Sequence, residues 1–292
     1  MAEAPRPTAG RLAIIAGSGL LPFYVATAAR HAGEDPFIIL LKDDTDRRWD
    51  GFDHAGMGIG DMVQLRALLG TWGIGRVVLS GGVARRPDWR EIRPNLRSLL
   101  KMPAVIRTLL SGGDDAVLQM VIKLIEAQGC TVIGAHEIAP ELLATTGPLG
   151  AHRPSAEDLA DIDRAATAAI ALGVLDVGQG AVSVGGRIVA LEGVEGTDRM
   201  LERVTSLRAE GRISARRRGV LVKLCKPQQD VRADLPSVGV STVRNALAAG
   251  LAGIAIEAGR ALVLERDEMI READAAGLFV CGIDRGLSGV WM

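Results

Sequence analysis

The chain has 292 residues, of which 48% are hydrophobic and 3% aromatic, and its formal net charge is −1. This length and apolar share are sufficient for two domains with buried cores. The near-neutral charge and the scarcity of aromatic residues argue against a nucleic-acid-binding protein, which would carry a basic face or stacking platforms. We therefore expect no nucleic-acid partner.

Cysteine and histidine usage argues against a disulfide framework and against a zinc site. Cys130, Cys225 and Cys281 are odd in number and widely spaced, which is typical of reduced thiols in a cytoplasmic protein. The histidines show no paired zinc-ligand spacing, so a required metal would be Mg²⁺ or Mn²⁺ on oxygen ligands. We expect residues 1–10 to be a disordered tail, because they lack the apolar core of a signal peptide. No stretch has the apolar length that crosses a bilayer.

The first half of the chain alternates predicted strands and helices. We expect strands at residues 11–16, 36–41, 76–80 and 131–135, and helices at residues 21–31, 61–69, 99–110 and 114–127. Such alternation predicts a parallel sheet with helices on both faces, a Rossmann-like domain whose ligands bind at the carboxyl ends of the strands. The helix at 99–110 is apolar on more than one side, so it either lines an acyl channel or belongs to the core.

A glycine turn, Gly17-Ser18-Gly19, connects the first predicted strand to the first predicted helix. Strand, glycine turn and helix together point backbone N–H groups at an anion. The third glycine of the dinucleotide-binding fingerprint is missing, however. The turn therefore predicts either a phosphate or sugar contact or ordinary tight-turn chemistry, and the residues leave both open.

A turn-rich stretch at residues 145–154 separates the two halves of the chain, and we place the domain boundary there. The predicted domains are residues 11–148 and a C-terminal catalytic domain at 149–292. Helices are expected in the second half at 155–172, from about 197, at 241–249 and at 267–276, and strands at 181–184, 187–191, 220–224, 253–257, 261–265 and 278–283. The fold class is therefore α/β: an N-terminal Rossmann-like parallel-sheet domain plus a second mixed α/β domain, joined by a linker.

Acidic and hydroxyl residues gather where the helix near residue 197 should begin. Thr197 is suited to cap that helix, and Glu195 and Asp198 would favour its dipole. Alternatively, Glu195 and Asp198 are additional metal or substrate ligands. The residues alone do not separate capping from binding.

The loop after the strand at 220–224 is the densest group of charged residues between two prolines. Pro227 and Pro236 fix φ at two points and should stiffen the segment between them. Its charged and polar members are Lys226, Gln229, Asp230, Arg232 and Asp234. Two carboxylates can hold a hard cation such as Mg²⁺, and basic side chains can neutralise phosphate oxygens. Mixed charges of this kind also occur on ordinary solvated surfaces.

Five motifs, taken together, are specific. In chain order they are Ile15-Ala-Gly-Ser-Gly-Leu-Leu-Pro22, Gly134-Ala-His-Glu137, Asp176-Val-Gly-Gln-Gly-Ala181, Glu195-Gly-Thr-Asp198 and Lys226-Pro-x-Gln-x-x-Arg-x-Asp-Leu-Pro-x-x-Gly239. With these motifs the chain resembles the LpxI-type UDP-2,3-diacylglucosamine pyrophosphatases of bacterial lipid A synthesis. The resemblance covers nearly the whole sequence in the right order.

The resemblance implies hydrolysis of UDP-2,3-diacylglucosamine to UMP and 2,3-diacylglucosamine 1-phosphate, by water attack at the sugar-side phosphorus with the help of Mg²⁺ or Mn²⁺. It implies two domains that hold the lipid between them, in a cytoplasmic enzyme that contacts the inner membrane peripherally. A homodimer is plausible by base rate.

The resemblance also implies site residues. The family's functional aspartate falls on Asp234, and Asp230 stands where an acidic residue is usual, so we predict both as catalytic residues and, with Asp198, as metal ligands. Asp234 either holds the ion or orients the water, and we favour metal ligation. Predicted substrate-binding residues are Gly17, Ser18, Gly19, Gln179, Gly180, Glu195, Thr197, Lys226, Gln229 and Arg232. Ser18 stands where many members should have glycine.

Two alternatives belong to other functional classes. A nucleotide-cofactor oxidoreductase would use the Gly17 to Gly19 turn and would bind NAD or NADP tightly. A non-catalytic nucleotide-lipid carrier would leave its ligand unchanged after long incubation with Mg²⁺.

Overall fold

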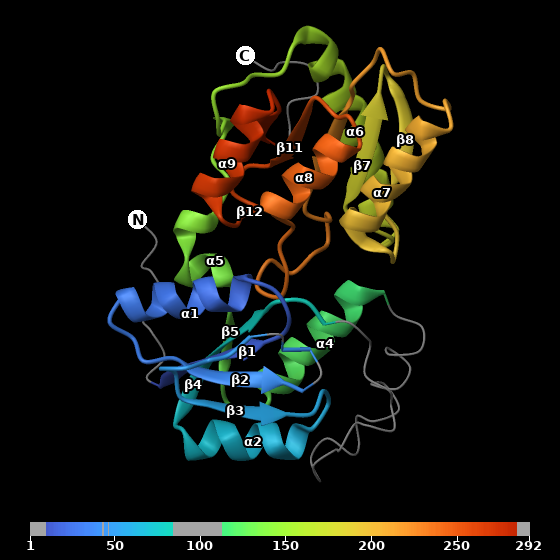
Figure 1. Cartoon of the computed structure of the whole chain (residues 1–292). Helices are drawn as coiled ribbons and strands as arrows, with labels where there is room; N and C mark the ends of the chain where they lie inside the picture. The colour runs from blue at the N-terminus through green and yellow to red at the C-terminus, as the bar shows by residue number, and fades with distance from the viewer. Residues whose placement is uncertain (1–9, 43, 46, 84–112, 285–292) are drawn as a thin grey trace, which may run out of the picture. The chain divides into compact units, whose positions relative to one another are not determined.

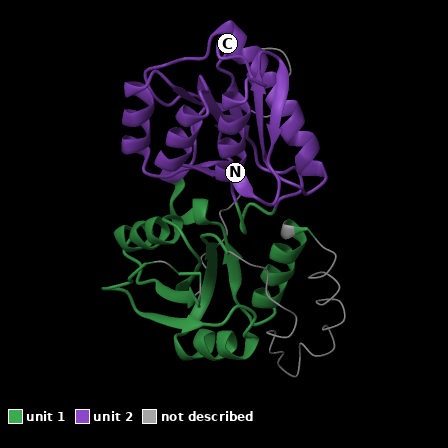
Figure 2. Ribbon diagram, turned by 45° about the vertical axis from the view of Figure 1, so that its right-hand side comes forward, with its two compact units in different colours: residues 1–140, 230–234 green, residues 141–229, 235–292 purple. Residues whose placement is uncertain are grey.

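The computed structural model describes residues 10–42, 44, 45, 47–83 and 113–284 (Figure 1). The predicted tail up to residue 9 and the predicted helix at 99–110 lie outside the described residues. Two compact units make up the chain: unit 1 comprises residues 1–140 and 230–234, and unit 2 comprises residues 141–229 and 235–292 (Figure 2). The domain boundary that we place between 148 and 149 stays a prediction.

Unit 1 contains a parallel five-stranded sheet in the order β3-β2-β1-β4-β5, as Figure 1 shows. Its elements are β1 (Arg11–Ala16), α1 (Leu21–His31), β2 (Phe37–Leu41), β3 (His54–Met57), α2 (Met62–Thr71), β4 (Ile74–Ser80), α4 (Asp114–Glu126), β5 (Thr131–Ile133) and α5 (Ala135–Ile138). The sheet is buried on both faces, which is why β1 and β2 consist of continuous apolar runs. The predicted Rossmann-like parallel sheet is confirmed.

Each face of this sheet has its own core. On one face α2 and α4 pack against the strands, through side chains such as Leu65 and Ile122. On the other face α1 packs with Val25 and Ala29, and Trp49 lies in the same cluster. The helices therefore cover both faces, and the polar loops remain at the strand ends.

Unit 2 contains a mixed six-stranded sheet in the order β6-β13-β11-β9-β7-β8. Its elements are β6 (Gly147–Pro148), α6 (Ala156–Val174), β7 (Gly180–Val184), β8 (Arg187–Leu191), α7 (Gly196–Ala209), β9 (Val220–Lys223), β10 (Ser237–Val238), α8 (Val240–Ala248), β11 (Gly253–Glu257), β12 (Leu262–Val263), α9 (Arg266–Ala275) and β13 (Phe279–Ile283). A short 3₁₀ helix, η3 (Pro140–Leu142), precedes β6. Unit 2 has two hydrophobic cores. One contains residues of α7, α8 and α9, and the other contains residues of α6. The predicted mixed α/β character of this half is confirmed.

Local signals explain several elements of unit 2. Ser155 and Asp158 form the predicted capping box at the start of α6, since the Asp158 carboxylate accepts a bond from the Ser155 N–H at 2.9 Å. Gly185 and Gly186 form the predicted turn between β7 and β8, with φ values of 60° and 78°. The buried Asp161 accepts bonds from both of their amides, at 2.9 and 2.7 Å, and thereby fixes the turn to α6.

The structure corrects some local predictions. The strand β3 was not predicted, because His-Ala-Gly-Met is short and has little apolar pattern. The strand expected at 261–265 is only β12, which pairs with β10 outside the main sheet. The residue before α4 is Gly113 rather than a capping aspartate. Thr197 lies inside α7, whose N-cap position is Glu195, so Thr197 does not cap the helix as we expected.

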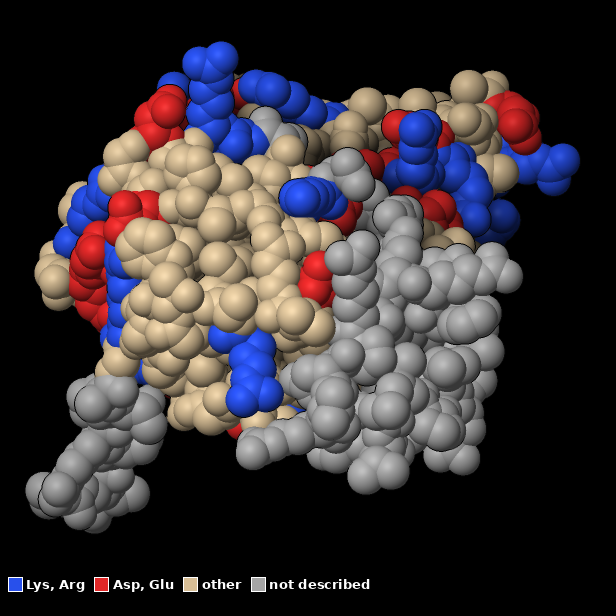
Figure 3. Space-filling model, turned by 90° about the horizontal axis from the view of Figure 1, so that it is seen from below, with Lys and Arg blue, Asp and Glu red and all other residues tan. Residues whose placement is uncertain are grey.

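The described residues show how charge is distributed on one face and whether any helix could span a membrane. On the face drawn in Figure 3, acidic and basic side chains lie interspersed around a mostly uncharged area. Among the described helices, none has both the length and the apolar character to span a membrane.

Candidate active site

One edge of the unit 2 sheet collects most of the predicted substrate-binding residues. β9 and β11 run parallel and end at this edge, while β7 runs antiparallel to β9 and begins there, with Gly180 opposite Lys223. β8 returns to the same edge, with Leu191 opposite Ala181. The predicted residues at this edge are Gln179, Gly180, Glu195, Thr197, Lys226 and Gln229. Residues from three separate sequence motifs therefore meet at one place.

Lys226 is held at this edge by a partly buried ion pair. Its Nζ lies 2.6 Å from Asp176 Oδ1, and the side chain of Lys226 is only 10% exposed. Gln229 stabilises the same turn, because its side-chain oxygen accepts a hydrogen bond from the Lys226 N–H at 3.0 Å. Gln229 thus has a structural contact in addition to the substrate contact that we predicted.

Glu192 organises the neighbouring segment. This buried carboxylate accepts bonds from the Gln179 N–H at 3.3 Å and from the Thr197 hydroxyl at 2.7 Å. A Cβ atom at Gly180 would lie 2.7 Å from Glu192 Oε2, so a larger residue there would displace the Glu192 carboxylate. Within the described part of the chain, the buried side-chain oxygen of Gln179 has no hydrogen-bond partner.

The acids at the start of α7 each have a protein partner. Glu195 Oε1 lies 3.1 Å from Arg203 Nη2, and Asp198 Oδ1 accepts a bond from Asn245 Nδ2 at 2.8 Å. These contacts show how the acids are held in unit 2. They do not by themselves indicate a metal.

Exposed aliphatic side chains lie beside the polar edge. Val174, Leu175 and Val177 are 62%, 73% and 50% exposed; Val174 ends α6, and the other two lie in the connection between α6 and β7. Leu191, at the end of β8, is 41% exposed. The two segments are neighbours, since a Cβ atom at Gly178 would meet the backbone oxygen of Glu192. Polar and aliphatic groups are thus next to one another at this end of unit 2.

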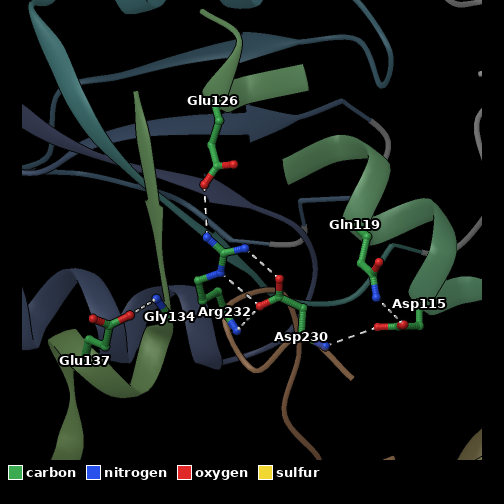
Figure 4. A network of polar contacts seen from close by, with 7 residues as sticks. All are labelled: Asp115, Gln119, Glu126, Gly134, Glu137, Asp230 and Arg232. Carbon is green, nitrogen blue, oxygen red and sulfur yellow. Dashed lines mark hydrogen bonds and ion pairs between the residues drawn. The ribbon is translucent and has the colours of Figure 1, made fainter. Parts of the chain in front are cut away.

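The segment from Asp230 to Asp234 belongs to unit 1, although it lies in the second half of the sequence. Figure 4 shows Arg232 between Asp230 and Glu126 of α4. The Arg232 guanidinium donates to both carboxylate oxygens of Asp230, at 3.0 and 2.7 Å, and to Glu126 Oε1 at 3.0 Å. Asp115 accepts a bond from the Asp230 N–H at 3.3 Å.

This network changes the acidity of its members. The hydrogen bond from the Arg232 side chain lowers the pKa of Asp230 below its ordinary value. The same bond raises the pKa of Arg232. Both groups are therefore charged at neutral pH, and Asp230 is a poor proton acceptor.

Asp234 differs from Asp230 in its surroundings. It is exposed, and its backbone N–H donates to the Asp230 carbonyl oxygen at 3.4 Å. The two aspartates of this segment are therefore not equivalent, although the sequence presents them as a pair.

The glycine turn after β1 packs against the turn after β4. Ser18 and Gly82 exchange backbone hydrogen bonds of 2.8 and 2.9 Å. A Cβ atom at Gly17 would lie 2.2 Å from the Gly82 carbonyl oxygen. Packing between two loops of unit 1 therefore accounts for the glycine at 17, and the substrate contact that we predicted for Gly17, Ser18 and Gly19 stays a prediction.

Comparison with known proteins decides the family. Residues 11–142 match the LpxI N-terminal domain, and residues 145–281 match the LpxI C-terminal domain. The chain is 42% identical over 275 residues to the UDP-2,3-diacylglucosamine pyrophosphatase LpxI of Caulobacter vibrioides, which covers 94% of this chain and 98% of that protein. This chain belongs to the LpxI family.

Solved structures offer only weak likenesses to this LpxI-family chain. WbmG of Bordetella bronchiseptica in complex with NAD is 17% identical, covers 44% of this chain and 37% of its own, and gives a TM-score of 0.27. The UDP-glucose 4-epimerase of Thermus thermophilus in complex with NAD is 10% identical, with coverage of 94% and 86% and a TM-score of 0.29. Neither likeness supports an argument about function.

The divalent cation expected for the LpxI family can be tested against the carboxylates. Within the described residues, no three His, Cys, Asp or Glu side chains form a group that could hold a metal ion. Both oxygens of Asp230 are bound by Arg232, and Asp198 belongs to unit 2. The roles of Asp230, Asp234 and Asp198 as metal ligands therefore stay predictions. Mg²⁺ commonly binds through one or two carboxylates plus substrate phosphates, and the exposed Asp234 fits that mode.

Sequence reasoning missed several residues that organise the candidate site. Asp176 stands in a motif that we recognised, and only the structure reveals its pairing with Lys226. Glu192 is a single acid at a strand end and gave no signal of its own. Asp115 and Glu126 are more than a hundred positions from their partners in the loop, so spacing could not have found them.

Proposed function

We propose that this chain hydrolyses the pyrophosphate bond of UDP-2,3-diacylglucosamine, releasing UMP and 2,3-diacylglucosamine 1-phosphate. One observation carries the proposal: a relative that is 42% identical over 94% of the chain is named as the pyrophosphatase for this substrate. Because the alignment also covers 98% of that relative, both domains of the enzyme are present in this chain.

The polar edge of unit 2 is suited to one part of such a substrate. Lys226 supplies a positive charge for phosphate oxygens, and Asp176 fixes its position. The side-chain oxygen of Gln179 can accept a bond from a sugar hydroxyl or a base N–H. The exposed aliphatic residues Val174, Leu175 and Val177 can contact acyl chains. An amphiphilic nucleotide lipid combines these chemistries.

In unit 1, Asp234 is our candidate for the chemical step. Pyrophosphate hydrolysis needs alignment of water and neutralisation of charge more than it needs a covalent nucleophile. Asp234, in a segment anchored on unit 1, orients the attacking water or would hold the expected ion. A bound Mg²⁺ would neutralise phosphate oxygens and promote ionisation of water.

Water attack at the sugar-side phosphorus makes the proposal testable by isotope labelling. The purified protein should convert UDP-2,3-diacylglucosamine in H₂¹⁸O with Mg²⁺, and ³¹P NMR should follow both products. We expect ¹⁸O in 2,3-diacylglucosamine 1-phosphate and none in UMP. A substrate that stays intact would contradict the hydrolase and favour the carrier, whereas label in UMP would overturn the site of attack.

A further inference from the structure

We propose that Glu126 and Asp115 of α4 are positioning residues for Asp234, and that they act through an anchor formed by Arg232 and Asp230. In this anchor Asp230 serves as the anion that holds Arg232, instead of as a metal ligand. The importance of Asp234 rests on the proposed function, whereas the anchor itself rests on contacts within unit 1.

The first observation is the geometry of Arg232. Its Nε and Nη2 donate to Oδ1 and Oδ2 of Asp230 at 3.0 and 2.7 Å, which is a bidentate pair. The Arg232 N–H donates to Asp230 Oδ1 as well, at 3.0 Å. Because Arg232 Nη1 also donates to Glu126 at 3.0 Å, the loop is tied to the last residue of α4. Figure 4 shows this chain of contacts running from α4 to the loop.

The second observation is a separate attachment at the other end of α4. Asp115 is buried, and its Oδ1 accepts the Asp230 N–H at 3.3 Å while its Oδ2 accepts from Gln119 Nε2 at 2.7 Å. Gln119 therefore orients the carboxylate from one turn further along the helix. Ala233 packs against the core cluster that contains Ile122 and Ile125 of the same helix. Polar and apolar contacts thus fix the loop to α4 on both sides of Arg232.

The charges of this cluster argue against a direct role in binding the substrate or a metal ion. Asp230 and Glu126 both accept from the single Arg232 guanidinium, and the Asp115 carboxylate accepts the Asp230 N–H. The cluster therefore carries more negative than positive charge and would repel a phosphate. If Asp230 bound a cation, that positive charge would compete with the Arg232 guanidinium for the same carboxylate. An anchoring role is consistent with all the hydrogen bonds of Asp230 and Arg232 described above. In this role Arg232 holds the loop and does not bind the substrate.

The consequence concerns catalytic geometry. Asp234 follows Arg232 by two residues, so a loop held at Asp230 and Arg232 leaves Asp234 little freedom to move. When the tie to Glu126 is lost, the loop samples other positions and a smaller fraction of the enzyme has Asp234 in place. Substrate contacts in unit 2 are unaffected. The turnover number should therefore fall while KM stays nearly constant.

Hydrogen exchange tests the anchor without relying on the reaction. In Glu126→Gln, amides of residues 230–235 should exchange about threefold to tenfold faster, because one partly exposed charged contact is weakened. Amides of β9 should be unchanged. The matched control is Glu210→Gln, which removes an exposed acid that lies 3.1 Å from Arg212. Unchanged exchange at 230–235 in Glu126→Gln would overturn the anchor.

Kinetics test the positioning role and the role of Asp230. Glu126→Gln should lower kcat about threefold to tenfold with KM within about twofold, and Glu126→Asp should recover part of the loss. Asp230→Asn should lower kcat without changing the Mg²⁺ concentration that gives half-maximal activity. If Asp230→Asn raises that concentration about tenfold or more, Asp230 is a metal ligand and the proposal is wrong.

The two experiments fail in different ways. Faster exchange together with a wild-type protein that does not hydrolyse the substrate would retain the anchor and reject the proposed function. Unchanged exchange in an active enzyme, with unchanged kcat in Glu126→Gln, would reject the anchor and retain the function. Faster exchange with unchanged kcat would show that the anchor does not position Asp234.

Discussion

At the scale of single residues, two aspartates of one short loop have different environments. Asp230 is bound on both oxygens by Arg232, whereas Asp234 is exposed. Both aspartates and Arg232 could be identified from the sequence, because they lie in a charged segment that two prolines should stiffen. It could not distinguish their roles, since the residues that separate them, Asp115 and Glu126, come from a distant helix.

The state of Asp230 predicts a pH-dependent stability. Its lowered pKa means that the Arg232 bonds stabilise the fold above the ordinary aspartate pKa, and that this contribution is lost as pH falls through the lowered value. Asp230→Asn should therefore lower Tm by about 2–4 °C at pH 7, a modest amount because the Arg232 side chain is 37% exposed.

Calorimetry from pH 7 downward measures this effect. The Tm difference between the wild-type protein and Asp230→Asn should disappear below the lowered pKa of Asp230, where both side chains are neutral. A difference that stays constant down to the lowest pH at which the wild type still unfolds cooperatively would be inconsistent with a charged pair. Glu210→Gln serves as the control, because it removes an exposed acid elsewhere.

At the scale of elements, the order of helices and strands was largely predictable. Continuous apolar runs gave β1, β2 and β11, and glycine and capping signals bounded α6 and the hairpin of β7 and β8. The short strands β3 and β10 were missed, because two to four residues carry too little periodicity, and the strand expected at 261–265 is limited to β12. The backbone hydrogen bonds between the turns after β1 and β4 could not be predicted from the sequence either.

These two turns give a prediction about backbone packing. Gly17→Ala should destabilise unit 1 by about 1–3 kcal/mol, because its Cβ would lie 2.2 Å from the Gly82 carbonyl oxygen and the loops would have to separate. Gly58→Ala is the matched control, since its Cβ would have no neighbour within 4 Å. Urea denaturation compares the two variants. Equal stabilities would show that the turns do not need this close approach.

At the scale of the whole molecule, the family and the two-domain α/β class followed from motifs spread over nearly the whole sequence. The division of the loop could not be foreseen: residues 230–234 pack with unit 1, whereas the residues before and after them belong to unit 2. Assignment of a five-residue segment to the other unit depends on side-chain partners that are remote in sequence. Predicted site residues in the same motif, such as Lys226 and Asp234, consequently belong to different units.

The proposed ion adds a prediction for the complete enzyme. Removal of divalent cations with EDTA should lower turnover at least about 100-fold, because charge on the pyrophosphate is then not neutralised. Excess Mg²⁺ should restore it, and EDTA already saturated with Mg²⁺ should have no effect. Full activity in the presence of free EDTA would exclude a dissociable cation.

The most direct test of the account is the turnover of UDP-2,3-diacylglucosamine by Asp234→Asn beside the wild type, with the exposed Asp267→Asn as control. The account predicts at least about a 100-fold loss of kcat in Asp234→Asn with the Tm unchanged, and wild-type rates for Asp267→Asn. Hydrolysis by Asp234→Asn at close to the wild-type rate would contradict the central claim.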